Sequence, residues 1–442
     1  MVWQDLIAVD EVRLAVVVTL LLFFFTAADA AGSLSMTNVA SLPGFDGALP
    51  SRLETGYVTI DEDNGAELFY YFIESEGDPS TDPVLLWLTG GDRCSVLSAL
   101  FFEIGPLKLV IEPYNGELPK LRYHPYSWTK VASILFVDSP VGAGFSYSRD
   151  PKGYDVGDVS ASMQLIKLLR EWFIEHPNYL SNPFYVGGDS YAGKIVPFIT
   201  QKISEDIEAG VKPTLNLKMI MEHCKGEDYD NPKNEICRQG LTRFESLLDE
   251  GSHAQILDRK CIYASPVLNH ETIYRKILME KIGVLKHAPP QPSIKCGVYA
   301  NYLSYFWANS NVTRKTLGIK KGTVNEWVRC HEHDLPYTKD ISSSIKYHHN
   351  VTLKGYRALV YSGDHDAVIP FLGTQAWVRS LKYPIVDDWR AWHIDGQSAG
   401  FTIAYGNNLT FATVKGGGHT APEFEPERCF AMFKRWISNM AL

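Results

Sequence analysis

Ser190 is the residue whose surroundings most strongly indicate chemistry. It stands in Phe184-Tyr-Val-Gly-Gly-Asp-Ser-Tyr-Ala-Gly193, an apolar strand pattern that leads into a sharp turn and then a helical pattern. A serine at such a turn resembles a nucleophile elbow, which needs small residues beside it because the strand and the helix cross closely. Gly188 and Ala192 are small enough, although glycine is the commoner residue at the second position. The alternative is an ordinary Gly-rich turn, so the interpretation depends on whether partners follow.

Partners for Ser190 follow two later strand patterns. One apolar run ends at Asp364 and is followed by Asp366, and a second run, 409–414, is followed by His419. The order serine, acid, histidine is that of the α/β-hydrolases, whose chemistry lies beyond the carboxyl ends of the strands. The imidazole would take the serine proton, and the carboxylate would hold its tautomer and stabilise the imidazolium. Each residue alone would be read as a loop residue, and one of the two aspartates is expected to be just that. Together they predict a Ser-His-Asp triad.

Six separated motifs in a consistent order extend this pattern over roughly residues 35 to 440. They are Trp87-Leu-Thr-Gly-Gly-Asp-Arg-Cys-Ser95, Glu103-Ile-Gly-Pro106, Phe136-Val-Asp-Ser-Pro-Val-Gly-Ala-Gly-Phe-Ser-Tyr147, Gly188-Asp-Ser-Tyr-Ala-Gly-Lys194, Tyr361-Ser-Gly-Asp-His-Asp366 and Gly416-Gly-Gly-His-Thr-Ala-Pro422. In these motifs the chain resembles the serine carboxypeptidase-like proteins of plants. The resemblance implies Ser190 as nucleophile, Asp366 rather than Asp364 as the acid, and His419 as the base.

The resemblance also implies an oxyanion hole made of two backbone N–H groups, which would aim at the oxygen that becomes negative during acyl transfer. One group belongs to Tyr191, the residue after the nucleophile, and the other to Gly91 in the turn after an earlier strand. The family usually continues Gly-Gly-Pro-Gly-Cys at this turn, whereas this chain has Asp92 and Arg93 in place of proline and glycine. This change alters the permitted backbone angles and adds charge beside the site.

The residues around the elbow suggest which acyl transfer takes place. In the family, peptidases usually place Glu before the nucleophile and Asn before the paired glycines, and these groups with a second Glu recognise a peptide carboxylate. This chain has Asp189, Thr89 and Glu103 at those positions. The Gly-Asp-Ser-Tyr form resembles the acyltransferase branch, which moves acyl groups from 1-O-glucose esters to small-molecule acceptors without a cofactor. The alternatives are a serine carboxypeptidase, which would use water, and a catalytically inactive secreted relic.

The alternation of strand and helix patterns predicts an α/β-hydrolase fold, a doubly wound and mostly parallel sheet with an inserted cap at about 220–350. The mature chain, 31–442, is expected to be a single domain. Within the cap, Val324–Arg329 is predicted to be a helix. Relatives usually continue past Lys218 with a full strand and a Gly-Asn turn, and several tens of those residues are absent here. Either 217–221 forms a substitute strand or the sheet ends early, and this gap is the reason for keeping the inactive alternative.

The first thirty residues are expected to be a secretory signal peptide. Arg13 precedes an apolar run, 14–25, and Ala28-Asp29-Ala30 has the small-x-small form of a cleavage site. A signal anchor is the less favoured alternative, and no later segment is apolar enough to cross a bilayer. The resemblance favours the vacuole over the cell exterior. The net charge of −9 and the absence of a basic stripe argue against a nucleic-acid partner, and the sequence does not indicate an oligomeric state.

The cysteines and sequons agree with the secretory pathway. Three acceptor asparagines for glycosylation are present, Asn311, Asn350 and Asn408. No metal-ligand spacing occurs, and His331-Glu-His333 is interpreted as a solvated loop. Seven cysteines lie beyond the signal, which in an oxidising compartment leaves one over after pairing. The resemblance implies the pairs Cys94–Cys330, Cys224–Cys237 and Cys261–Cys296, with Cys429 free.

Overall fold

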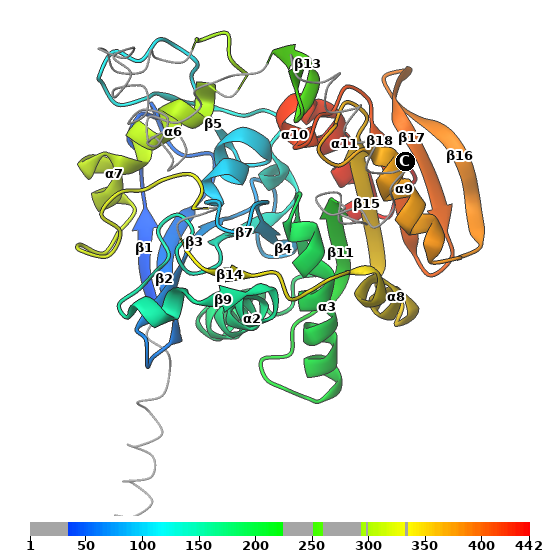
Figure 1. The fold of residues 1–442 in the computed structure, drawn as a ribbon, viewed down its shortest axis with the longest axis horizontal. Coiled ribbons are helices and arrows are strands. Elements are labelled where there is room, and N and C mark those ends of the chain that lie inside the picture. Colours follow the sequence, from blue (N-terminus) through cyan, green and yellow to red (C-terminus); the bar gives the residue numbers. More distant parts are fainter. Residues whose placement is uncertain (1–33, 224–250, 260–292, 298, 332–334) are drawn as a thin grey trace, which may run out of the picture.

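The fold is built on one large mixed sheet with helices on both sides (Figure 1). The computed structural model describes residues 34–223, 251–259, 293–297, 299–331 and 335–442. The predicted signal peptide and much of the predicted cap lie outside these residues. Among the described residues the sheet has this order: β1 (Ser35–Val39), β2 (Leu53–Asp61), β3 (Ala66–Ile73), β7 (Ser133–Asp138), β4 (Val84–Leu88), β10 (Phe184–Gly188), β11 (Leu217–His223), β15 (Arg357–Gly363), β18 (Leu409–Val414), β17 (Gln397–Tyr405) and β16 (Ile385–Ile394), with β8 (Tyr147–Ser148) paired to β3.

The centre of the sheet is parallel and its two margins are antiparallel. Parallel pairing runs from β7 through β4, β10, β11 and β15 to β18. The opening strands β1, β2 and β3 pair antiparallel. The α/β-hydrolase fold expected from the sequence is therefore confirmed, and the carboxyl ends of β4, β10, β15 and β18 lie along one edge.

The gap after Lys218 does not interrupt the sheet. Strand β11 starts at Leu217 and pairs in parallel with β10 on one side and β15 on the other. Of the two outcomes considered, the substitute strand is the one observed. Its backbone groups therefore find ladder partners on both sides, so β10 and β15 do not present unpaired edges in the middle of the sheet.

Alternate residues of each central strand point to opposite faces, and each face is covered by its own helices. In β4, for example, Leu85 and Trp87 join one apolar cluster while Val84, Leu86 and Leu88 join the other. The second cluster packs α2, α3 and α9, and the first packs η1, α6 and α11. The helices are α2 (Asp158–Glu175), α3 (Ala192–Glu208), α6 (Tyr299–Asn309), α7 (Asn311–Thr316), α8 (Ile345–Leu353), α9 (Phe371–Ser380), α10 (Ala421–Phe424), α11 (Pro426–Ile437) and the π-helical turn η1 (Ala99–Glu103).

Short ladders stand apart from the main sheet. They are β5 (Leu107–Leu109) with β6 (Leu121–Tyr123), β9 (Val156–Gly157) with β14 (Tyr337–Thr338), and β12 (Gly251–Ser252) with β13 (Gln255–Arg259). Short 3₁₀ helices of three or four residues occur at Trp128–Lys130, Pro151–Tyr154 and Pro177–Tyr179. In the described part of the chain, none of the helices combines the length and the apolar composition that crossing a membrane requires.

The prediction of a helix at Val324–Arg329 is wrong. This segment is irregular, and a side chain rather than a helical ladder satisfies its backbone. The Asn309 side chain accepts a hydrogen bond from the Trp327 N–H (2.8 Å) and donates one to the Trp327 carbonyl (2.9 Å). The Trp327 ring is buried, so burial of the indole and two bonds to one asparagine outweigh the helical pattern. The sequence analysis also missed the β16–β17 hairpin, which forms the right-hand edge of the sheet in Figure 1.

Candidate active site

Ser190 lies at the turn between β10 and α3, in a backbone conformation that few residues other than glycine adopt. Its φ is +49°, in the left-handed region where residues other than glycine are uncommon. The turn is tight because a Cβ on Gly188 would lie only 2.7 Å from the Cβ of Ala192. Such strain at a non-glycine residue persists only where surrounding structure enforces it, which is the usual situation at functional sites. The sharp turn predicted from the sequence is present.

The structure brings together the three residues proposed as a triad. The Nε2 atom of His419 is 2.7 Å from the Oγ of Ser190, and the Nδ1 atom is 3.0 Å from Oδ2 of Asp366. These residues follow β18, β10 and β15, whose carboxyl ends lie at the same edge of the sheet, with β11 between β10 and β15. Both distances are within hydrogen-bonding range, so the imidazole links the hydroxyl to the carboxylate.

The backbone that follows Asp366 holds its carboxylate in the orientation that His419 requires. Its side chain is fully buried, and Oδ1 accepts hydrogen bonds from the N–H groups of Val368 (2.8 Å) and Ile369 (3.1 Å). These bonds leave Oδ2 directed at the imidazole. Asp364 is the loop residue of the two aspartates. Its Oδ1 accepts the Gly416 N–H at 2.7 Å and ties the loop after β15 to the loop after β18. The geometry thus agrees with the assignment of the second aspartate.

The turn after β4 lies directly against the nucleophile. A Cβ on Gly90 would lie 2.4 Å from the Cβ of Ser190 and 3.1 Å from Oδ2 of Asp189, so only glycine fits. The Gly90 N–H donates to Oδ1 of Asp189 at 3.0 Å. Gly91 follows with a φ of +78°. The turns that carry the two proposed oxyanion donors, Gly91 and Tyr191, therefore flank Ser190.

The Tyr191 side chain is anchored away from the turn by a buried carboxylate. Its hydroxyl donates to Oδ1 of Asp158 at 2.6 Å, and the hydroxyl of Tyr337 donates to the same oxygen at 2.9 Å. Lys194 completes the group at 3.7 Å from Oδ2. Burial and this contact with Asp158 raise the pKa of the Tyr191 phenol, so it stays a donor and holds the backbone that follows Ser190.

Asp92 and Arg93, the departures from the family pattern, attach the turn after β4 to distant segments. The Arg93 side chain is buried and donates to the backbone carbonyls of Val141, Tyr154 and Pro336. Burial lowers the pKa of its guanidinium. Asp92 forms an ion pair with Lys339 at 3.5 Å. Both side chains that replace the family's proline and glycine therefore contact the segment 336–339.

Beside this turn, Cys94 forms the disulfide with Cys330 that the resemblance implies. Cys296 is also disulfide-bonded, whereas Cys429 is free and buried, and burial raises the pKa of its thiol. Cys224, Cys237 and Cys261 lie outside the described residues. The asparagines of the three sequons, Asn311, Asn350 and Asn408, are all exposed, and their modification remains a prediction.

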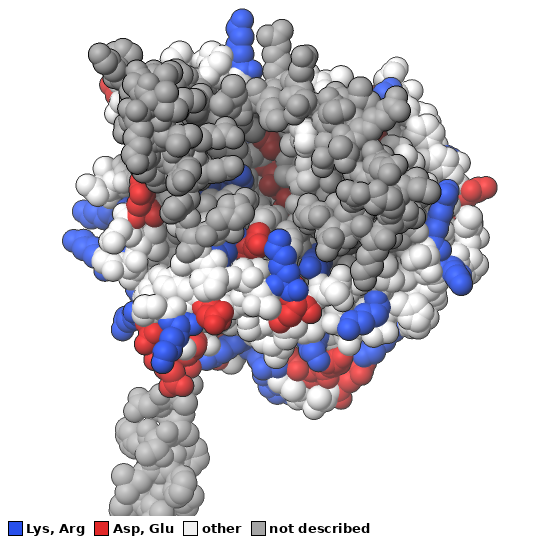
Figure 2. Space-filling model, viewed as in Figure 1, with Lys and Arg blue, Asp and Glu red and all other residues white. Residues whose placement is uncertain are grey.

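A group of acidic side chains adjoins the nucleophile. Asp189 is buried. A Cβ placed on Gly90 would lie 3.1 Å from Oδ2 of Asp189 and 3.0 Å from Oγ of Ser190, so this carboxylate and the nucleophile face the same glycine. Burial, and then repulsion from Asp189 and Glu423, raise the pKa of Glu103 well above its ordinary value, while Lys108 opposes the shift. Atoms of Asp and Glu residues, in red, are visible inside the hollow that opens on the face shown in Figure 2.

Glu423 is the member of this group that the sequence analysis missed. Its Oε2 accepts a hydrogen bond from the Thr420 hydroxyl at 2.6 Å, and burial raises its pKa. The only signal for it was its position, one residue beyond the motif that contains His419. Thr89 is half-buried at the end of β4. We call Glu103, Asp189 and Glu423 the carboxyl cluster.

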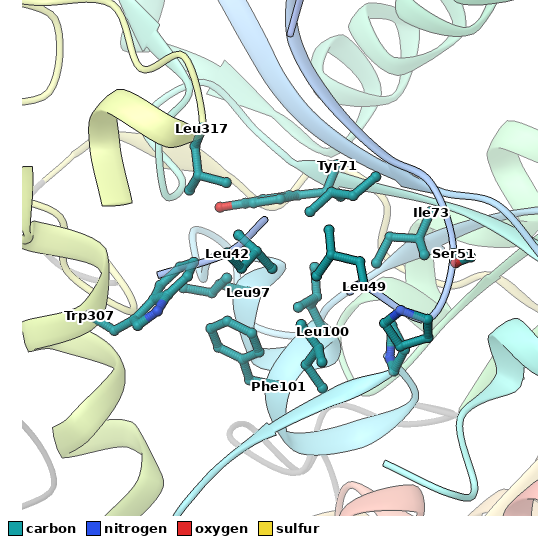
Figure 3. A pocket seen from close by; sticks show the side chains of 14 residues that line it. Leu42, Leu49, Ser51, Tyr71, Ile73, Leu97, Leu100, Phe101, Trp307 and Leu317 are labelled. Atoms are coloured by element: carbon teal, nitrogen blue, oxygen red, sulfur yellow. The ribbon is translucent and has the colours of Figure 1, made fainter. Parts of the chain in front are cut away.

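An apolar cavity lies elsewhere, between the segment 42–53, the sheet and the cap helix α6 (Figure 3). Leu42, Leu97, Leu100, Phe101 and Trp307 point into it. None of the proposed triad or the carboxyl cluster lines it. Apart from the hydroxyl groups of Ser51 and Tyr71 its lining is apolar, and it contains no histidine, lysine or carboxylate that could act as a base, so this cavity does not compete with the site at Ser190.

Comparison with known proteins agrees with the fold and gives the family. The serine carboxypeptidase family matches residues 43–221 and 218–439, which together span most of the chain. The chain belongs to this family. Serine carboxypeptidase-like 19 of Arabidopsis thaliana is 42% identical over 443 residues, covering 91% of this chain and 94% of the relative. Serine carboxypeptidase-like 17 of the same plant is 43% identical over 417 residues, covering 92% and 94%.

Among solved structures, the prohormone-processing carboxypeptidase Kex1 of Saccharomyces cerevisiae aligns with a TM-score of 0.64. It is 17% identical, with 88% of this chain and 91% of that chain covered, so this likeness speaks for the fold alone. The family match is divided within β11, at the same point where the sequence analysis places the gap. Family members are serine hydrolases or acyltransferases, so the protein is an enzyme of the serine hydrolase kind.

Proposed function

We propose that this protein is an acyltransferase that moves an acyl group from a 1-O-glucose ester to a small-molecule acceptor. Ser190 Oγ attacks the ester carbonyl while His419 takes its proton, and the N–H groups of Gly91 and Tyr191 hold the oxyanion. The bond to the sugar oxygen breaks, and His419 protonates the departing glucose. His419 then takes a proton from the acceptor hydroxyl or amine, whose attack on the acyl group releases Ser190.

The carboxyl cluster is the observation that carries this proposal. Carboxylate oxygens accept hydrogen bonds from hydroxyl groups, which a sugar supplies in number. A peptide carboxylate would instead need the peptidase set of groups, and two of these differ here: Asp189 is one methylene shorter than glutamate, and Thr89 lacks the paired donor and acceptor of asparagine. Asp189 is also already engaged, because its Oδ1 accepts the Gly90 N–H. The cluster therefore favours a neutral polyhydroxyl donor over a peptide with a free C-terminus.

A serine carboxypeptidase is the second candidate, and the state of Glu103 favours it. Since burial and its acidic neighbours raise the pKa of Glu103, this side chain is protonated under acidic conditions. A protonated carboxyl group can donate a hydrogen bond to a peptide carboxylate. This candidate shares the triad and differs only in the acceptor, which is water.

The first experiment tests the nucleophile without knowledge of the substrate. Wild-type protein should react with a fluorophosphonate probe, and the Ser190→Ala variant should not. The variant should also lose at least about 10³-fold in turnover of any substrate that the wild type accepts. Labelling of the variant, or an unlabelled but folded wild type, would refute the proposal, and the latter would favour an inactive relic.

The second experiment separates the two candidates. The wild type is incubated with hydroxycinnamoyl glucose and mixed alcohol and amine acceptors, and separately with an N-blocked dipeptide. We expect acylated acceptor and free glucose from the first mixture and little release of amino acid from the second. The reverse result would identify a carboxypeptidase. Ser190→Ala serves as the blank in both mixtures.

A further inference from the structure

The hairpin of β12 and β13 lies beside the two loops that carry Asp366 and His419. In Figure 1, β13 lies next to α10, the helix that begins just after His419. The carbonyl of Ala254, at the tip of the hairpin, accepts the His419 N–H at 2.6 Å. The carbonyl of His253 accepts the N–H of Ala367 at 3.0 Å. Two consecutive hairpin residues therefore bind the histidine loop and the acid loop at once.

We propose that Gln255 in this hairpin is a positioning residue, which holds the acid loop and the histidine loop at the separation that proton transfer requires. Its side chain is buried at 6% exposure. The amide oxygen is 3.0 Å from Nδ1 of His365, the residue before Asp366. The amide nitrogen donates to the carbonyl of Gly416, three residues before His419, at 3.0 Å. This inference rests on the proposed triad.

An amide of this length suits the position because it presents an acceptor and a donor on one rigid plane. An acid at the same place would lack the donor for Gly416, and an alanine would lack both groups. The partners are also fixed from the other side, since the N–H of Ile256 donates to the His365 carbonyl at 3.2 Å. Gln255 thus adds a side-chain bridge to the direct bonds between these two loops, which are the Gly416 N–H to the Asp364 carboxylate and the His365 N–H to the Gly417 carbonyl at 2.8 Å.

The contact leaves little room for adjustment. A Cβ on Gly418 would lie 2.3 Å from the carbonyl oxygen of Ala254, so the histidine loop is pressed against the hairpin. The proposed bonds of His419 to Ser190 and Asp366 depend on where this loop lies. A displacement of 1 Å in a catalytic group can cost about 10²-fold in rate. Loss of one bridging side chain, with the backbone bonds of the hairpin kept, should cost less than this.

The test compares Gln255→Ala with Leu257→Ala, a matched control in the same hairpin whose side chain is 76% exposed. Turnover of p-nitrophenyl acetate and the rate of fluorophosphonate labelling are measured for both variants and the wild type, together with thermal unfolding. Gln255→Ala should lower kcat and the labelling rate by about 10-fold, with KM within twofold of wild type, because proton transfer and not binding is disturbed. Leu257→Ala should match the wild type in all three quantities.

A double-mutant cycle with His365→Ala shows whether Gln255 acts through the acid loop. Since the two side chains share one contact, the double variant should be no slower than about the slower single variant, whereas independent effects would multiply. Gln255→Glu keeps the acceptor and loses the donor, so it should fall between wild type and Gln255→Ala. It also serves as the measured variant if Gln255→Ala does not fold.

Three results would overturn the inference. The first is an unchanged kcat in Gln255→Ala or, if that variant does not fold, in Gln255→Glu. The second is an equal loss in Leu257→Ala. The third is a lowered unfolding temperature with normal labelling, which would make the role of Gln255 purely structural. A folded wild type that does not react with the probe would instead refute the triad itself, and with it this inference.

Discussion

Replacing Asp366 by asparagine should invert the hydrogen bonding along the triad without removing any atom of its framework. Oδ1 of Asp366 accepts the N–H groups of Val368 and Ile369, and Oδ2 faces Nδ1 of His419. In the asparagine variant, the amide oxygen must remain opposite the two backbone donors. The amide NH₂ then faces Nδ1, the imidazole proton moves to Nε2, and Nε2 can no longer accept the proton of Ser190.

The size of the loss follows from the alternative orientation. Turning the amide around would set its NH₂ against two backbone N–H groups and leave both without an acceptor, at about 1–3 kcal/mol each. At 1.36 kcal/mol per factor of ten, the active orientation would be populated at about 10⁻² to 10⁻⁴. We therefore expect kcat and the fluorophosphonate labelling rate to fall by about 10²- to 10⁴-fold, with thermal unfolding near that of the wild type.

The matched control is Asp364→Asn, two residues earlier. Asp364 Oδ1 accepts the Gly416 N–H, and His365 Nε2 lies 3.8 Å from the same oxygen. An amide oxygen can accept the same bond, so this variant should stay within about threefold of wild type. The reasoning would be refuted if Asp366→Asn kept more than a tenth of the wild-type rate. It would also be refuted if Asp364→Asn were the more damaged of the two.

Three further outcomes are expected. Gly90→Ala should abolish probe labelling, because its Cβ would overlap Ser190. Gly116→Ala, in an exposed turn with a φ of +92° and nothing within 4 Å, strains only its own turn and should label normally, and equal labelling of the two would contradict the geometry. Arg93→Ala should lower the free energy of unfolding by about 2–4 kcal/mol in urea titrations, since it deprives three carbonyls of a donor, and an unchanged midpoint would show that these bonds contribute nothing. Burial raises the pKa of Asp138 to about 6 from its ordinary 3.8, so the folded state keeps a proton that the unfolded chain releases between these values. The resulting stabilisation, about 3 kcal/mol, is complete below about pH 4 and lost as the pH rises through 6. Asp138→Asn should remove this pH dependence of the free energy of unfolding. Urea titrations from pH 4 to 7 measure it, and a variant that kept the wild-type dependence would contradict the assignment.

The sequence predicted the strands of the sheet well because they are short apolar runs bounded by turn residues. The run at 409–414 coincides with β18. The predicted helix at 324–329 failed because a partner 18 residues away, Asn309, satisfies the backbone instead. The substitute strand β11 could be named as one outcome, but only pairing with its two neighbours decided it.

The candidate triad was accessible from the sequence, whereas its surroundings were not. Ser190, Asp366 and His419 could be selected because each follows a recognisable strand in a characteristic order. Glu423 and Gln255 follow no such signal. Gln255 reaches its partners across 110 and 161 residues of chain, and nothing in its neighbours along the chain announces that contact.

The sequence by itself therefore determined which residue types could do the chemistry and on which strands they stand. It did so because the alternation of apolar residues and the small residues at turns are local properties. Tertiary structure alone decided which acidic groups gather beside Ser190, what Arg93 binds, and how the hairpin joins the acid and histidine loops. These contacts depend on the packing of segments distant in sequence, whose approach is governed by loop closure and burial rather than by local pattern.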